Sequence, residues 1–306
     1  FEGVRAVDWS AYLGERDAFP VKGSSLDSTL TSIPACQKII KKAVVEKLRE
    51  TYRTSWFEED GPVHQIVFRI FKNRVSIMLD TTGAALNKRG YRALSNDAPI
   101  KETLAAAMAE LSRVRRNHTV VDPFCGSGTI LIESARKALN ILPGIDRTFA
   151  FEAWEQIDPA ILELERQKAR EAERHDASFI AYGYDIDGAA LDLARRNAEL
   201  AGVGDRIIFE RRDIRDYADT YERAAVITNP PYMGSSAMSA ELSAFVKDNY
   251  PAGKADLFAC FMERCAELTR LDGCFTMIVQ HAWMFLSSYR RLREVMARYT
   301  LRDLVH

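Results

Sequence analysis

The chain lacks an excess of charge of either sign, because 42 lysines and arginines nearly balance 43 aspartates and glutamates and leave a formal net charge of −1. A uniformly basic surface is therefore excluded, and any surface for nucleic acid would have to be local. The sequence also lacks C-x-x-C pairs and histidines at metal-ligand spacing around its five cysteines, Cys36, Cys125, Cys260, Cys265 and Cys274. This argues against zinc, an iron–sulfur cluster or a disulfide framework, and favours free thiols in a reducing cytoplasm.

A long hydrophobic run is missing as well. The longest apolar segment, CFTMIVQHAWMFL, is interrupted by Gln280 and His281 and is too short to cross a bilayer, and there is no signal peptide. The remaining composition, with 47% hydrophobic and 28% charged residues in a chain of 306, is that of an ordinary globular protein with room for two domains. The chain starts at Phe1 without a methionine and ends in DLVH, which reads as strand interior. We therefore expect a fragment of a longer protein that lacks residues at both ends, with the second domain truncated at its C-terminus.

Residues 1–95 have the pattern of a small α+β unit. The stretch IPACQKIIKKAVVEKLRETY spaces its apolar residues as a helix does and leaves a basic outer face. HQIVFRIFKN and RVSIMLDTT alternate apolar and polar residues, which predicts two strands joined by a tight turn at Lys72 and Asn73. The polar stretch GAALNKRGYRALSNDAP then predicts an interdomain linker. We expect one domain over residues 1–95 and a second over residues 96–306.

From Pro99 onward, predicted strands and helices alternate, as they do in parallel α/β sheets. Five strands are expected, in HTVVDPF, FIAYGYDI, RIIFERRDI, RAAVITNPP and GCFTMIVQ. The helix DGAALDLARRNAELAG has Asp187 as its N-cap and Gly202 just past its end. An insertion at about 140–178 contains ILELERQKAREAERH, whose mixed charges predict a solvated helix. The pattern predicts an α/β, Rossmann-like domain.

The first of these strands ends in a glycine-rich turn, VVDPFCGSGTILIE. Glycines there let the backbone approach a ligand closely. The G-x-G-x-x-G spacing of a dinucleotide site is absent, and no lysine follows Gly128 as a Walker loop requires. Asp122 would repel phosphates and suits a cationic nucleotide without phosphates, which points to S-adenosylmethionine (SAM) rather than to a purely structural turn. The candidate cofactor residues here are Asp122, Pro123, Phe124, Cys125, Gly126, Ser127, Gly128 and Thr129.

The next two strands also end in acidic residues. In GYDID, Asp185 is placed to accept hydrogen bonds from both ribose hydroxyls of a nucleoside, and Ile186 to pack on an adenine face. In ERRDI, Asp213 is placed to accept a hydrogen bond from the adenine amino group, with Ile214 beside it. A structural aspartate and a solvated loop are the alternatives for Asp185 and Asp213. Because parallel strands end at one edge of the sheet, these residues should converge with the glycine turn.

The fourth strand ends in TNPPY, at the same edge. An exocyclic amino group is a poor nucleophile, because its lone pair is delocalised into the base. Two fixed acceptors, the Asn229 side-chain oxygen and the Pro230 carbonyl, would bind its N–H groups and favour a pyramidal nitrogen facing the SAM methyl group, with Pro231 keeping the backbone rigid. Tyr232 would stack on the base. The alternative is a turn with an aromatic plug. Asn229, Pro230, Pro231 and Tyr232 are the candidate catalytic residues, and Asn229 also faces the cofactor.

These motifs resemble those of class I SAM-dependent methyltransferases that act on amino groups. Residues 1 to about 230 resemble the THUMP-domain RNA guanine-N2 methyltransferases, including those of large-subunit ribosomal RNA. The matching stretches are FPVKGSSLDSTLTSIPACQKIIKKAVVEKL, DTTGAALNKRGYR, APIKETLAAAM, VVDPFCGSGTILIESA and NILPGIDRTFAFEAW. The resemblance implies that residues 1–95 are most of an RNA-binding THUMP region with its ferredoxin-like partner. It also implies that APIKE lines the SAM pocket, through Pro99, Lys101 and Glu102.

After Tyr232 the resemblance changes. NPPYMGSSAMSAELSAFVKDNYPAGKADLFACFMERC and HAWMFLSSYRRLREVM resemble adenine-specific DNA methyltransferases of phage-exclusion (BREX) systems. The short Gly-Glu-Arg type segment that follows the tyrosine in the RNA family is absent. The change occurs where the target base would be recognised, so it concerns the substrate and leaves the expected reaction unchanged.

The expected function is SAM-dependent methylation of an exocyclic amino group of a nucleobase, at guanine N2 in ribosomal RNA or tRNA. Adenine N6 in DNA is the alternative substrate, and a catalytically inactive nucleic-acid-binding module is the alternative of another class. Lys88, Arg89 and Arg92 near the linker are candidates for phosphate contacts, with a solvated surface as the simpler interpretation. We expect a cytoplasmic protein without a metal or a membrane partner. Its oligomeric state does not follow from the sequence.

Overall fold

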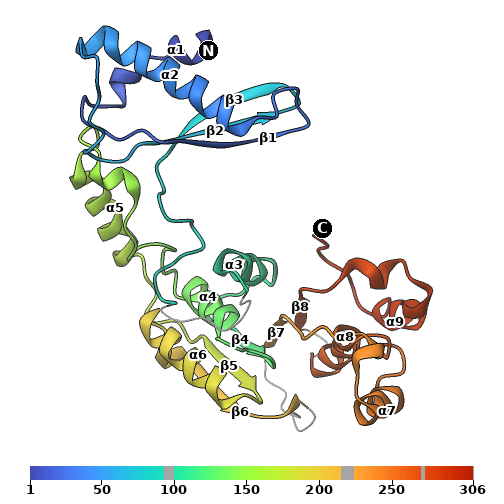
Figure 1. Ribbon diagram of the computed structural model, residues 1–306. Helices are drawn as coiled ribbons and strands as arrows, with labels where there is room; N and C mark the ends of the chain where they lie inside the picture. The colour runs from blue at the N-terminus through green and yellow to red at the C-terminus, as the bar shows by residue number, and fades with distance from the viewer. Residues whose placement is uncertain (93–99, 215–223, 270–272, 306) are drawn as a thin grey trace. The chain divides into compact units, whose positions relative to one another are not determined.

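A computed structural model describes residues 1–92, 100–214, 224–269 and 273–305 (Figure 1). The chain divides into two compact units, Phe1–Leu86 with Asp146–Gln167 and Asn87–Ile145 with Lys168–His306. The predicted domain boundary after residue 95 and the candidate residue Pro99 lie outside the described residues. Among the helices that are described, none is long and apolar enough to cross a membrane.

The N-terminal unit is built on a three-stranded sheet in the order β1-β2-β3. β1 (Val21–Leu26) runs parallel to β2 (Gln65–Phe71), which pairs antiparallel with β3 (Arg74–Asp80). Lys72 and Asn73 join β2 to β3 with φ angles of 49° and 61°, the left-handed conformation of a tight hairpin. The predicted turn is therefore confirmed, whereas the polar sequence VKGSSL of β1 does not predict a strand.

Helix α2 (Ile33–Tyr52) packs against this sheet, with α1 (Glu2–Arg5) and the 3-10 turn η1 (Trp9–Ala11) against it in turn. The helix begins after Ser32, whose hydroxyl accepts a hydrogen bond from the Ala35 N–H. Its apolar side chains share a core with Phe19, Ile66 and Phe68; the buried residues of α2 are Cys36, Ile40, Ala43, Val44 and Leu48. The polar residues of α2 consequently face outward, as the sequence predicts.

The predicted insertion supplies the rest of the N-terminal unit, through η2 (Ala150–Ala153) and α5 (Pro159–Glu171). Its backbone forms hydrogen bonds with the chain just after β3. Trp154 stacks on His64 with ring centroids 4.3 Å apart and an interplanar angle of 16°. α5 has no buried residue, in agreement with a solvated helix. The structure thus adds residues 146–167 to the N-terminal unit, which the predicted division at residue 95 does not include.

The second unit contains a five-stranded sheet in the order β6-β5-β4-β7-β8, in which all neighbours are parallel. The strands are β4 (Thr119–Asp122), β5 (Ile180–Asp185), β6 (Ile207–Arg211), β7 (Ala224–Thr228) and β8 (Cys274–Met277). The chain adds β5 and β6 on one side of β4 and then returns to add β7 and β8 on the other. The strand order reverses beside β4, which is where open α/β sheets bind their ligands.

The helices of this unit follow its strands in the predicted alternation. They are α3 (Glu102–Leu111), α4 (Thr129–Ala138), α6 (Gly188–Leu200), α7 (Ala240–Asn249), α8 (Leu257–Leu268) and α9 (Arg290–Met296). Short 3-10 turns occur at η3 (Gly204–Arg206), η5 (Ser235–Ala237), η6 (His281–Met284) and η7 (Ser287–Tyr289). Asp187 caps α6 by accepting the Ala189 N–H at 2.9 Å, as predicted. α7 is an additional helix that the sequence pattern does not predict.

Candidate active site

The glycine turn follows β4 at the carboxyl edge of the sheet. Gly126 and Gly128 have φ angles of 50° and 78°, and α4 begins directly after Gly128. A Cβ atom at Gly128 would lie 3.0 Å from the ring of Phe209 on β6. Both the backbone conformation and this close approach therefore require glycine. The Cys125 N–H donates to the Tyr184 carbonyl at 2.9 Å, which fixes the turn against β5.

Asp185, at the end of β5, connects the glycine turn to the next loop. Its Oδ2 accepts the Gly126 N–H at 3.0 Å, and its Oδ1 accepts the Asp187 N–H at 2.9 Å. Each carboxylate oxygen can accept more than one hydrogen bond, so the side chain retains capacity for a ligand. Ile186 beside it is 62% exposed. The arrangement leaves an acceptor and an exposed apolar side chain next to each other.

Asp122, the last residue of β4, is only 1% exposed. Its Oδ1 accepts the Thr228 hydroxyl at 2.7 Å and the Phe124 N–H at 3.1 Å. Burial raises the pKa of Asp122 to about 7; the two hydrogen bonds oppose this shift, and the charge of Asp185 adds to it. The Asp122 carboxyl group thus joins β4 to β7 behind the glycine turn.

The sequence Asn229-Pro-Pro-Tyr232 follows β7, the strand next to β4. Asn229 is half-buried and Pro230 is buried, whereas Pro231 and Tyr232 are exposed. The Tyr232 hydroxyl donates to the Ile278 carbonyl at 2.7 Å and lies 3.2 Å from Asn229 Oδ1. Because a phenol has a single proton, the shorter contact dominates and Asn229 Oδ1 keeps its capacity to accept other hydrogen bonds. The tyrosine is held at its hydroxyl end while 41% of the residue is exposed.

The chain after Tyr232 is fixed to the start of α8. Asp256 Oδ1 accepts the Met233 N–H at 3.0 Å and the Phe258 N–H at 3.3 Å, so it caps α8 and holds this segment at once. The Leu257 N–H donates back to the Met233 carbonyl at 3.1 Å. Phe258 packs near Tyr232, with ring centroids 6.0 Å apart. These contacts set the direction in which the tyrosine ring leaves the sheet edge.

The other candidate residues lie around the starts of α3 and α4 and after β6. Burial raises the pKa of the Cys125 thiol well above its usual range, so this thiol is neutral and unsuited to be a nucleophile. Lys101 is exposed, whereas Phe124, Asp213 and Ile214 are half-buried. The buried candidates are Glu102, Pro123, Cys125, Ser127 and Thr129.

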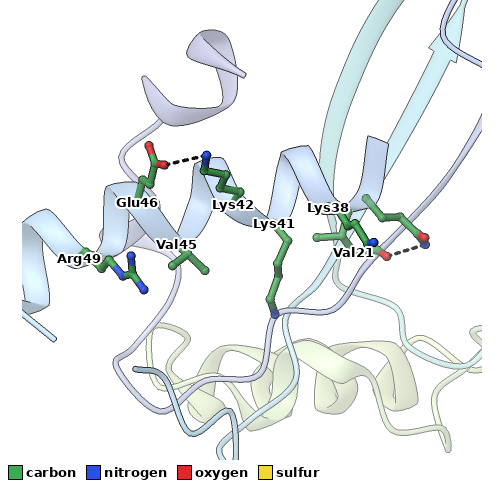
Figure 2. A pocket seen from close by; sticks show the side chains of 8 residues that line it. Val21, Lys38, Lys41, Lys42, Val45, Glu46 and Arg49 are labelled. Atoms are coloured by element: carbon green, nitrogen blue, oxygen red, sulfur yellow. Dashed lines mark hydrogen bonds and ion pairs between the residues drawn. The ribbon is translucent and has the colours of Figure 1, made fainter. Parts of the chain in front are cut away.

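A second surface feature lies on the N-terminal unit, where α2 and Val21 border a shallow groove of about 600 Å³ (Figure 2). Its basic side chains are Lys38, Lys41, Lys42 and Arg49. Lys41 is engaged within the unit, with its Nζ 2.6 Å from Glu59 and 3.7 Å from the centroid of the Phe19 ring. Lys42 lies 3.7 Å from Glu46. Four basic side chains thus border this groove, and Lys41 and Lys42 are paired with glutamates.

The chain matches two family models. Residues 89–299 match the RMKL-like methyltransferase domain (UPF0020), and residues 1–80 match the THUMP domain. Together with the fold and the motifs at its carboxyl edge, these matches show that the chain belongs to the RMKL-like methyltransferase family and carries an N-terminal THUMP domain. The predicted class I methyltransferase fold preceded by a small α+β domain is confirmed.

Individual relatives agree with this assignment. The "Putative RNA methyltransferase YpsC" of Bacillus subtilis (strain 168) is 41% identical over 234 residues, which cover 76% of this chain and 61% of YpsC. The chain thus spans about three fifths of that relative's length. A "predicted N6-adenine-specific DNA methylase" of Listeria monocytogenes is 33% identical with a TM-score of 0.81, covering 95% of this chain and 72% of its own. SMU.472, a "putative methyltransferase complexed with SAH", is 35% identical with a TM-score of 0.77. The match covers 90% of this chain and 69% of SMU.472.

The structure corrects the prediction for two arginines and adds one residue to the candidate site. Arg89 and Arg92 are not surface residues: their side chains are 10% and 13% exposed and pair with Glu133 and Glu102. This makes them unavailable for phosphates. Thr228, which binds Asp122, is a further site residue that the sequence does not reveal, because a strand threonine has no distinctive pattern. The position of Asp256 before α8 follows the helix-cap pattern, and that signal is present in KADLFACF.

Proposed function

We propose that the protein transfers a methyl group from SAM to the exocyclic amino group of a nucleobase, with guanine N2 of ribosomal RNA as the first candidate and tRNA as the second. The observation that carries the proposal is the position of Asn229-Pro-Pro-Tyr232 directly after β7, one strand from the glycine turn that follows β4. Both lie at the carboxyl edge where the strand order reverses, the usual ligand position in such sheets. Membership of a methyltransferase family supports the reaction class.

The residues at this edge fit a cationic nucleoside without phosphates. Asp122, Asp185 and Glu102 supply carboxylates in the same region, and Thr129 takes the place where a phosphate-binding loop has lysine. Glu102 Oε2 is buried and has no hydrogen-bond partner among the described residues, which suits a positively charged ligand group. The complex of the similar SMU.472 with SAH supports the same cofactor. When bound, SAM supplies an electrophilic methyl group.

Specific contacts follow from the geometry of the two loops. Asp185 is proposed to accept the ribose hydroxyls, and Ile186 to pack on the adenine, because the carboxylate retains acceptor capacity and the isoleucine is exposed. Asp213 is proposed for the adenine amino group. The remaining proposed cofactor positions are Pro99, Lys101, Glu102, Asp122, Pro123, Phe124, Cys125, Gly126, Ser127, Gly128, Thr129, Ile214 and Asn229.

The proposed catalytic group is the pair of acceptors at Asn229 Oδ1 and the Pro230 carbonyl. They would bind the two N–H groups of the target amine and direct its lone pair at the methyl group. Pro230 and Pro231 cannot donate competing N–H groups and restrict the backbone. Tyr232, fixed at its hydroxyl by Ile278, would stack on the base. The methylated nitrogen is cationic and acidic, so its proton passes to water without a strong general base.

RNA is preferred as the substrate on the evidence of the N-terminal unit. It matches the THUMP domain, the relative YpsC is named an RNA methyltransferase, and the basic groove on α2 offers contacts to phosphates (Figure 2). Adenine N6 in DNA is the second candidate, supported by the name of the similar Listeria protein and by the resemblance after Tyr232. A cytoplasmic location stays a prediction.

Methyl transfer from labelled SAM to ribosomal RNA, tRNA and duplex DNA tests the proposal. We expect Asn229→Ala to abolish transfer while its affinity for SAM stays within about threefold, because the main role of this acceptor is to bind the amine and the other proposed cofactor residues still hold SAM. Asn117→Ala is the matched control, since Asn117 is exposed in the turn before β4. An inactive nucleic-acid-binding module would transfer no label to any substrate, and equal turnover of Asn229→Ala and wild type would refute the assigned role of Asn229.

Asp185→Ala tests the cofactor site separately. We expect its affinity for SAM to fall by about tenfold or more, as removal of hydrogen bonds to a charged acceptor does. Isothermal titration calorimetry measures this directly. An unchanged affinity would remove Asp185 from the cofactor site and leave the assignment of Asn229 untouched.

A further inference from the structure

Arg92 connects the starts of the two helices that flank the proposed cofactor site. Its side chain is 13% exposed. Its Nη2 donates to the Ile100 carbonyl at 3.0 Å and also to the Thr129 hydroxyl. Its Nη1 lies 3.6 Å from Glu102 Oε1. One guanidinium group therefore holds the first residue of α3, the chain leading into it and the first residue of α4.

The contacts of Arg92 continue into the glycine turn. Thr129 directly follows Gly128, and its hydroxyl lies 3.2 Å from that of Ser127. The Ser127 carbonyl in turn accepts the Asn197 side-chain N–H at 3.1 Å, which ties the turn to α6. A displacement of Arg92 would thus change the positions of both the glycine turn and Glu102.

Glu102 is buried and incompletely satisfied. Its side chain is 5% exposed. Oε1 faces Arg92, whereas Oε2 is buried without a hydrogen-bond partner among the described residues. Buried carboxylate oxygens in native proteins nearly always have a partner, because an unsatisfied one is costly. A ligand that brings a donor to this position would remove that cost.

A neighbouring carboxylate on α4 provides the contrast. Glu133 accepts the Tyr91 hydroxyl on Oε1 at 2.9 Å and lies 3.6 Å from Arg89 through Oε2. Both of its oxygens are engaged by the segment that also carries Arg92. The same segment therefore places a partner beside each oxygen of Glu133, but beside only one oxygen of Glu102 among the described residues. A purely structural pair would be expected to resemble Glu133.

We infer that Arg92 is a positioning residue of the cofactor site: it orients Glu102 so that Oε2 accepts a hydrogen bond from the ammonium group of the amino-acid end of SAM. The inference rests on the proposed function, since it takes SAM as the ligand. A cationic donor matches both the charge and the missing hydrogen bond of Glu102. Arg92 itself need not contact the ligand. Its effect passes through Glu102 on one side and through Thr129 and the glycine turn on the other.

The test compares two ligands that differ only at the amino-acid end. S-adenosylhomocysteine carries this end, whereas methylthioadenosine has the same nucleoside and sulfur without it. Titration calorimetry should show that Arg92→Met and the isosteric Glu102→Gln each lower the affinity for S-adenosylhomocysteine by about tenfold or more. This is the usual effect of losing a hydrogen bond between charged groups. The affinity for methylthioadenosine should stay within about twofold. Arg92→Lys, which retains the charge, should recover part of the loss.

Arg89→Met is the matched control, because it breaks the corresponding ion pair of Glu133. We expect it to lower thermal stability and to leave both ligand affinities unchanged. If Arg92→Met does not fold, Arg92→Lys tests the positioning role: it should weaken the binding of S-adenosylhomocysteine and leave that of methylthioadenosine unchanged, while Glu102→Gln tests the contact of Glu102 itself. Equal losses for both ligands, or none for either, would overturn the positioning role while the proposed function stands. Failure of the wild-type protein to bind S-adenosylhomocysteine at all would overturn the proposed function together with this inference.

Discussion

The hydrogen bond between Thr228 and Asp122 offers the sharpest test of how the two central strands are held together. Thr228 is fully buried and Asp122 is 1% exposed, and the donor–acceptor distance is 2.7 Å. Thr228→Val keeps the shape of the side chain and removes only the donor. The change therefore isolates the contribution of one hydrogen bond to a carboxyl group at the base of the proposed cofactor site.

The magnitude depends on the protonation state of Asp122. Its pKa is raised to about 7 in the folded protein, so the folded state retains a proton that the unfolded state has lost. Asp122 consequently favours folding at low pH and loses this contribution as the pH rises through about 7. Against a neutral carboxyl, the lost hydrogen bond is worth about 1 kcal/mol, and against the carboxylate about 1.5–3 kcal/mol.

Thr228→Val should therefore raise the pKa of Asp122 further, and its destabilisation should grow with pH. Each additional pKa unit adds about 1.4 kcal/mol to the loss once both proteins are ionised. We expect a small effect near about pH 5 and an effect larger by about 1–2 kcal/mol near about pH 9. Thr276→Val is the control, because Thr276 contacts the neutral Ser112 hydroxyl at 2.8 Å and its effect should not vary with pH.

The free energy of unfolding has to be measured separately for the two units. All five cysteines are free, and Cys265 reports the methyltransferase unit while Cys36 reports the N-terminal unit. A short pulse of a pyridyl disulfide along a urea titration, read by peptide mass spectrometry, gives the free energy of unfolding at each site. A loss for Thr228→Val that is constant between the two pH values, or smaller at the higher one, would refute the assigned ionisation of buried Asp122.

Three further substitutions test other parts of the account. Gly128→Ala should destabilise the methyltransferase unit by about 2–4 kcal/mol, from its φ of 78° and the contact with Phe209; a change in the thermal midpoint close to zero would contradict this. Asp256→Ala should cost about 1 kcal/mol through loss of the α8 cap and should lower turnover more than cofactor affinity, since it also holds Met233 next to Tyr232. Lys38→Ala should reduce the salt dependence of RNA binding by about 0.7–0.9 in the slope of log K against log salt, and an unchanged slope would exclude Lys38 of the groove as a phosphate contact.

The sequence predicts the methyltransferase sheet and its ligand edge well, because local chemistry decides them. Gly128 has to be glycine because its own backbone has a positive φ angle, and Asp187 caps α6, which begins at the next residue. These signals lie within a few residues of the element that they specify. The end of each strand can therefore be predicted from its own sequence. Because the carboxyl ends of parallel strands lie at one edge of the sheet, the residues at these ends are predicted to lie close together.

The parts that the sequence does not predict depend on contacts between distant segments. Nothing in the mixed charges of residues 146–167 indicates that Trp154 stacks on His64, about ninety residues earlier in the chain. The polar strand β1 forms because Gly23 can approach Phe68 on β2, where a Cβ atom would lie 2.1 Å from the carbonyl oxygen.

The same limit applies to Arg92 and to Thr228. Arginine near a linker predicts an exposed phosphate contact on composition alone, and only the fold shows that its partner is the buried Glu102. Thr228 becomes informative once β7 is known to lie beside Asp122 on β4. The role of a side chain that acts through a spatial neighbour from a distant segment cannot be predicted from the sequence around it.

The most direct test of the central claim is the identity of the methylated nucleoside. The protein is incubated with SAM that carries a deuterated methyl group and with unmodified ribosomal RNA, tRNA or duplex DNA, and the digested nucleosides are analysed by mass spectrometry. The account predicts labelled N2-methylguanosine in RNA with the wild-type protein and none with Asn229→Ala. Labelled N6-methyladenine in DNA would contradict the proposed substrate, and a label on carbon or on a ribose hydroxyl would contradict the amine-directed role of Asn229-Pro-Pro-Tyr232.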